Sequence, residues 1–69
     1  MKLFGNLRTF DAATRAGTIR PDQGGPPIQF DKAAVSWREA DTPEVEARLS
    51  YYIGQNLKGE PVALNLRPA

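Results

Sequence analysis

Short segments of alternating apolar and polar residues dominate the chain. In residues 2–10, Leu3, Gly5 and Leu7 share one parity, and polar residues occupy most of the other. Because side chains alternate between the two faces of a strand, this pattern is typical of a half-buried strand. We expect strands over four segments of this character: 2–10, 18–20, 28–30 and 61–66.

Turn-forming residues separate these segments. Residues 11–17 form a turn too short for a useful helix, and Pro21 ends the second segment ahead of a stretch rich in glycine and proline. Pro26 and Pro27 have no N–H to give to a sheet, so the third strand must begin at an edge or a bulge. Residues 54–59 form a further turn. Several short strands joined by such turns indicate a small sandwich or barrel.

The segment before the last turn carries two conflicting signals. Pro43 suits the first position of a helix and Gly54 suits its end. Residues 45–53 nevertheless alternate strictly between apolar and polar side chains, as a strand does. Periodicity alone therefore leaves residues 42–48 open between helix and strand.

The composition restricts the chemistry that the chain can carry out. With 69 residues we expect a single domain, over residues 1–69. There is no cysteine and no histidine, so the usual metal ligands and the usual general base are both missing. We expect no enzymatic activity, no metal and no cofactor. No apolar stretch approaches the roughly 18 residues that span a bilayer, and the N-terminus turns polar too soon for a signal peptide. We expect a cytoplasmic protein without membrane contact.

Charge is unevenly distributed along the chain. Residues 1–38 have a balance of +3, residues 39–46 a balance of −4, and the remainder a balance of +2. A basic first half can attract phosphate groups, whereas mixed charge on a solvated surface is what any small soluble domain needs. The acidic run is most simply a solvated loop, with a basic partner as the alternative.

Three motifs along the chain resemble those of the bacterial cold-shock domain. Residues 5–11 (GNLRTFD) match the family's opening Gly-x-Val-Lys-Trp-Phe-Asn pattern. Residues 14–19, followed by Pro21 and Asp22, match its first ribonucleoprotein motif and the Pro-Asp turn after it. Residues 28–35 match the second ribonucleoprotein motif. Weaker matches continue to the end of the chain, at 49–53, 58–59 and 63–66.

The resemblance implies an all-β fold, a small five-stranded antiparallel β-barrel of the oligonucleotide-binding (OB) type. It favours a strand over residues 47–53. The positions that face the barrel interior in the family stay apolar here: Leu7, Ile19, Ile28, Phe30, Val35, Leu49, Tyr51, Ile53 and Leu66.

Most of the outward aromatic side chains on which the family stacks bases are replaced. Five such positions carry other residues, namely Thr9, Ala16, Thr18, Gln29 and Lys32, and Asp31 stands where the family has a histidine. Each aromatic platform contributes about 1–3 kcal/mol per base, so any remaining affinity must depend more on charge and on salt. The resemblance then implies weak binding of single-stranded RNA or DNA through these residues: Arg8, Phe10, Arg15, Arg20, Lys32, Trp37 and Lys58.

Two of these residues also have purely structural interpretations. Phe10 can pack in the strand beside Phe4 instead of stacking on a base, and Trp37 can cover the open end of a small barrel. A second functional class is therefore open: a diverged cold-shock scaffold that has lost nucleic acid and contacts another protein, or a second copy through a sheet edge. That class predicts an apolar patch, around Trp37 and Tyr52.

Overall fold

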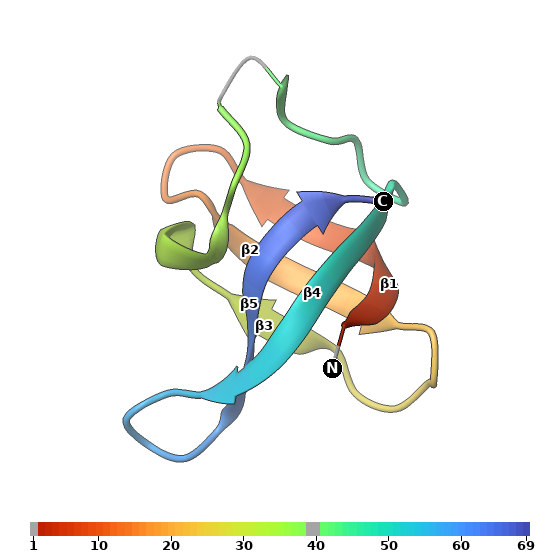
Figure 1. The fold of residues 1–69 in the computed structure, drawn as a ribbon. Helices are drawn as coiled ribbons and strands as arrows, with labels where there is room; N and C mark the ends of the chain where they lie inside the picture. The colour runs from red at the N-terminus through yellow and green to blue at the C-terminus, as the bar shows by residue number, and fades with distance from the viewer. Residues whose placement is uncertain (1, 39–40) are drawn as a thin grey trace.

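Five strands and one short 3-10 helix make up the fold (Figure 1). The computed structural model describes residues 2–38 and 41–69. The elements are β1 (Leu3–Asp11), β2 (Ala16–Pro21), β3 (Ile28–Phe30), the 3-10 helix η1 (Lys32–Ala34), β4 (Arg48–Gln55) and β5 (Pro61–Pro68). All five predicted strands are present, and β2, β4 and β5 are longer than predicted.

The strands close into a barrel in the order β1-β2-β3-β5-β4. All neighbours run antiparallel except β3 and β5, which are parallel and share the single pair Gln29–Val62. An odd number of strands in a closed ring cannot alternate in direction throughout, so at least one neighbouring pair must be parallel. The predicted five-stranded barrel of the OB type is thus confirmed, with this one parallel seam.

The ambiguous segment before β4 is neither helix nor strand over residues 42–47. It is tied to the barrel by backbone hydrogen bonds, from Leu7 N–H to the Ala47 carbonyl (2.9 Å) and from Glu46 N–H to the Leu7 carbonyl (2.8 Å). Arg20 adds an ion pair with Glu46 at 2.6 Å. The strand proper starts at Arg48, where pairing with both β1 and β5 becomes available, because tertiary pairing outweighs the local helix signals.

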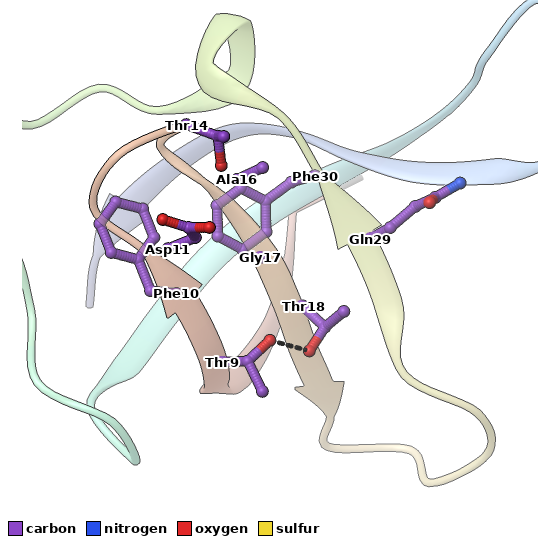
Figure 2. Close-up of a pocket in the computed structure, with 9 residues that line it drawn as sticks. All are labelled: Thr9, Phe10, Asp11, Thr14, Ala16, Gly17, Thr18, Gln29 and Phe30. Carbon is purple, nitrogen blue, oxygen red and sulfur yellow. Dashed lines mark hydrogen bonds between the residues drawn. The ribbon is translucent and has the colours of Figure 1, made fainter.

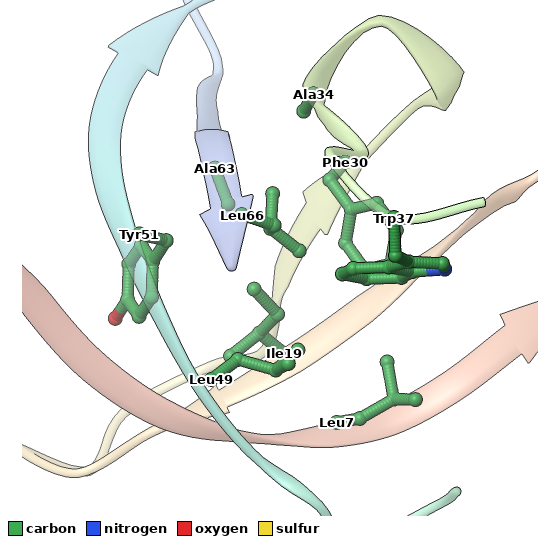
Figure 3. Packing of buried hydrophobic residues seen from close by; sticks show 9 residues of the cluster. All are labelled: Leu7, Ile19, Phe30, Ala34, Trp37, Leu49, Tyr51, Ala63 and Leu66. Atoms are coloured by element: carbon green, nitrogen blue, oxygen red, sulfur yellow. The ribbon is translucent and has the colours of Figure 1, made fainter. Parts of the chain in front are cut away.

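The core consists of nine buried side chains, seen together in Figure 3: Leu7, Ile19, Phe30, Ala34, Trp37, Leu49, Tyr51, Ala63 and Leu66. Ile28 and Val35 pack against this cluster. The prediction for Ile53 was wrong, because its side chain is 46% exposed. The pairing of β4 with β1 ends at Tyr51, so Ile53 lies beyond the closed part of the barrel.

Trp37 is only 7% exposed and packs beside Phe30 in the core. The prediction of an apolar surface patch that includes Trp37 was therefore wrong. Its position matches the structural interpretation, in which the indole covers the end of the barrel. A domain of this size needs that area, because it buries only about 60% of the surface of the unfolded chain.

Ionisation of Tyr51 is expected to lower the stability of the folded protein at alkaline pH. Burial, with a smaller effect from Asp22, raises the pKa of its phenol above the ordinary value of 10.0. The unfolded chain ionises first as pH rises, so the stabilising effect is complete below pH about 10 and is lost as pH climbs toward the folded-state pKa. We expect urea midpoints to fall above pH about 10 in the wild type, and to fall less in Tyr51→Phe. Tyr52→Phe, at an exposed tyrosine, is the control and should follow the wild type.

Candidate binding groove

A shallow groove of about 470 Å³ crosses β1, β2 and β3 (Figure 2). It lies over the strands that carry the residues expected to replace the aromatic side chains of the cold-shock family. Its lining comes from all three strands and from the β1–β2 turn: Thr9, Phe10, Asp11, Thr14, Ala16, Gly17, Thr18, Gln29 and Phe30.

Phe10 forms part of the apolar floor of this groove. Its ring stacks on Phe30 with centroids 6.2 Å apart and an interplanar angle of 19°, and it lies 5.9 Å from the Trp37 ring. The predicted packing beside Phe4 was wrong, because Phe4 lies elsewhere on β1, under the Arg48 guanidinium at 5.5 Å. Phe10 is therefore half-buried, with its position set by two core aromatics and part of its ring left at the groove.

The wall of the groove is polar where the cold-shock family has aromatic rings. The Thr9 and Thr18 hydroxyls lie opposite each other on β1 and β2 and share a hydrogen bond of 2.8 Å. Gln29 is exposed on β3 beside them. These groups can hydrogen-bond to a ligand but cannot stack on one, so the apolar contact available here is largely that of Phe10 and Phe30.

A second hollow of about 460 Å³ continues the groove toward the β4–β5 turn. It shares Ala16, Gln29 and Phe30 with the first and is lined further along by Gln55 and Asn56. The combined groove thus extends from the β1–β2 turn, across β2 and β3, to the β4–β5 turn. Gln55 and Asn56 were not among the predicted site residues, because uncharged amides at the end of a strand and in a turn carry no signal of their own.

Asn56 is held in place by its own turn. Its side-chain oxygen accepts hydrogen bonds from the N–H groups of Lys58 (2.9 Å) and Glu60 (3.0 Å), and its amide nitrogen donates to the Glu60 carboxylate at 3.0 Å. These bonds set the shape of the β4–β5 turn, and the Lys58 side chain borders a hollow of about 600 Å³ at this end.

Three of the predicted basic residues lie in hollows that adjoin the groove. Arg15 and Lys32 line a hollow of about 680 Å³ beside η1, and Lys58 lies at the β4–β5 end. No ion pair joins any of the three to a carboxylate within residues 2–38 and 41–69. Asp31 sits among them, where its carboxylate accepts from Ala33 N–H at 3.0 Å and caps η1. The groove is therefore mixed in charge.

Arg15 has a second, structural contact. Its guanidinium donates a hydrogen bond to the Trp37 carbonyl, and its backbone has a positive φ of 59°. This contact ties the β1–β2 turn to the segment that follows η1. Arg15 thus supports the end of the groove as well as contributing charge to it.

The other predicted site residues lie outside the groove. Arg20 is not among the residues that line the groove, and its guanidinium pairs with Glu46 at 2.6 Å. Arg8 is the extra residue of a bulge in β1, between the pairs Leu7–Ile19 and Thr9–Thr18, and is exposed. Trp37 lies in the core. The structure thus places Phe10 in the groove, Arg15 and Lys32 beside its β1–β2 end, and Lys58 beside its β4–β5 end.

The described part of the chain offers no cluster of acidic residues that could hold a metal ion. Within the same residues, no helix has the length and apolar character needed to cross a membrane. The arrangement suits non-covalent binding of an extended polar ligand across the strands. No protein-family model matches the chain, and no curated protein is significantly similar to it.

Proposed function

We propose that this protein binds short single-stranded RNA or DNA weakly along the groove between the β1–β2 and β4–β5 turns, without enzymatic activity. The observation that carries this proposal is the placement of Arg15, Lys32 and Lys58 in two hollows that adjoin the groove over β2 and β3 and share lining residues with it. This is the surface, with the same two turns, on which OB folds bind oligonucleotides and oligosaccharides. The motif resemblance to cold-shock domains favours the nucleic acid.

Electrostatic attraction and limited base stacking would both contribute to the affinity. Each cation that neutralises a phosphate of a single strand contributes about 0.7 to the slope of log affinity against log salt, so three cations give a slope of about −2. Phe10 adds a ring on which a base can stack. A fully exposed ring contributes about 1–3 kcal/mol per base, and the half-buried Phe10 should contribute less. We expect a Kd of about 100 µM at physiological salt, at the weak end of non-specific binding, and tighter binding at lower salt.

Removing the two lysines tests the proposal. We expect Lys32→Ala/Lys58→Ala to reduce the salt slope from about −2 to about −0.7, because one groove cation remains. The measurement is the anisotropy of a labelled oligothymidine, in its DNA and RNA forms, between about 20 and 200 mM salt. A label on the ligand is preferable to Trp37 fluorescence, because the buried indole is a poor reporter of the groove.

The matched control is Lys2→Ala/Arg67→Ala. It removes two exposed cations that are not among the residues lining the groove. This control should keep the wild-type slope if the groove is the site. An equal loss of slope in both double variants would mean non-specific attraction to the whole protein. No binding by the wild type at low salt would reject the nucleic-acid function.

A further inference from the structure

The β4 strand extends beyond its partner β1. Pairing of β1 with β4 ends at Leu3–Tyr51, whereas β4 itself continues to Gln55. Over residues 52–55 the strand pairs with β5 on one side, and no other strand of the described residues covers its second side. Figure 1 shows this end of the β4–β5 hairpin projecting from the barrel, at the lower left.

The backbone groups on this uncovered side can be assigned from the ladder. The Ala47 carbonyl accepts from Leu7 N–H of β1, and facing directions alternate along a strand, so Leu49 and Tyr51 also face β1. The same alternation directs the N–H and C=O groups of Ile53 and Gln55 to the side that β1 no longer covers. On the other side, Asn56 N–H bonds to the Glu60 carbonyl in the hairpin, as the alternation requires.

This edge lacks the charge and the proline that usually prevent pairing with another chain, and the irregularity of the β4–β5 ladder lies at its start, between Ser50 and Tyr52. Natural edge strands are typically protected by a charge, a proline or a bulge. Residues 49–57 contain no charged residue and no proline. Tyr52 is 38% exposed, Ile53 is 46% exposed and Leu57 is fully exposed, so apolar surface accompanies the free backbone groups.

We propose that this edge, residues 52–55, pairs antiparallel with the same segment of a second copy of the chain. In this pairing Ile53 lies opposite Gln55 of the second copy, and the two-fold axis passes through Gly54. The free N–H and C=O groups of Ile53 then face those of Gln55 in the other copy. Each such pair can exchange both backbone hydrogen bonds. A two-fold contact is self-complementary by construction, and the uncharged stretch means that no like charges oppose each other within it.

The dimer joins the two barrels through a continuous β5-β4-β4-β5 sheet. The paired segment is short, so the contact belongs to the small, transient class of interfaces. We expect dissociation constants of about 0.1–1 mM, so the dimer forms only in concentrated solution. The proposed dimer rests on the backbone of β4 and not on the proposed nucleic-acid binding, although Gln55 also lines the second hollow of the groove.

A charge placed on the edge tests the proposal. Sedimentation velocity of the wild type from about 10 µM to about 1 mM should show the average mass rising toward that of a dimer. Ile53→Lys should remain monomeric over this range, because a lysine on an edge strand opposes pairing and the two-fold axis would place the two new charges diagonally across from each other on one face. Val45→Lys is the matched control, since Val45 is 57% exposed in the loop before β4. It should associate like the wild type.

Amide exchange in the wild type provides a measurement that needs no variant. The Ile53 and Gln55 amides should become more protected as protein concentration rises, while exposed loop amides stay unchanged. A wild type that stays monomeric to about 1 mM would overturn the proposal. So would association that Ile53→Lys and Val45→Lys weaken equally, or Ile53 and Gln55 amides whose exchange is independent of concentration.

Discussion

Gly17→Ala is expected to prevent stable folding. A Cβ at this position would lie 2.1 Å from the Thr9 carbonyl oxygen and 2.9 Å from its carbonyl carbon, both backbone atoms of β1. The β1–β2 ladder cannot move apart without losing the pairs around Phe10–Gly17. We expect a loss of about 3 kcal/mol or more, close to the whole stability of a domain of this size. Circular dichroism during urea unfolding measures it.

Gly59→Ala separates this steric effect from the general cost of replacing glycine. Gly59 has a positive φ of 80° in the β4–β5 turn, and nothing lies within 4 Å of a Cβ built on it. The alanine there costs the strain of the left-handed backbone, about 1–2 kcal/mol, with no collision. If Gly17→Ala proved as mild as Gly59→Ala, the close contact between β1 and β2 would be wrong.

Trp37→Ala is the second substitution with a large expected effect. Removing a buried indole leaves a cavity against Phe10 and Phe30 and costs about 3–5 kcal/mol. We therefore expect the variant to be largely unfolded at room temperature. Trp37→Phe should lose less, because a ring still fills part of the space. It also removes an indole N–H that has no hydrogen-bond partner among the described residues.

Folding and binding must be separated in this variant. Tyr52→Ala truncates an exposed aromatic and should stay within about 1 kcal/mol of the wild type in the same urea titration. When Trp37→Phe is folded, its oligothymidine affinity should equal that of the wild type. If Trp37→Phe were folded but no longer bound oligothymidine, the result would support the hypothesis from the sequence that Trp37 contacts a base.

Much of the fold could be predicted because several patterns agreed. Alternation in β1, β3 and β5, the turns between them and the cold-shock motifs all favoured one small barrel. The segment before β4 stayed open, because Pro43 and Gly54 favour a helix locally while β1 and β5 offer strand partners that only the folded chain brings together. The prediction that Ile53 is buried was wrong for a related reason. The alternation of residues shows which face of the strand Ile53 occupies, but not where the barrel ends.

The candidate site was less predictable than the fold. The charged residues could be counted along the sequence, but only the barrel shows that Lys32 and Lys58 lie in hollows adjoining the groove, whereas Arg20 pairs with Glu46. Glu46 lies 26 positions from Arg20, and no local pattern links them. Phe10 and Trp37 were recognised as aromatic, but their burial depends on how β1 and the segment after η1 meet.

The ring order of the strands also constrains when the chain can fold during synthesis. β1 is made first, yet one of its two neighbours is β4, and the parallel seam needs β5, which is made last. A hairpin of β1 and β2 has too little apolar area to be stable alone. All five strands must therefore have left the ribosome before the barrel can close. Folding then becomes a single late event governed by distant contacts, and such events are slow for a chain of this length.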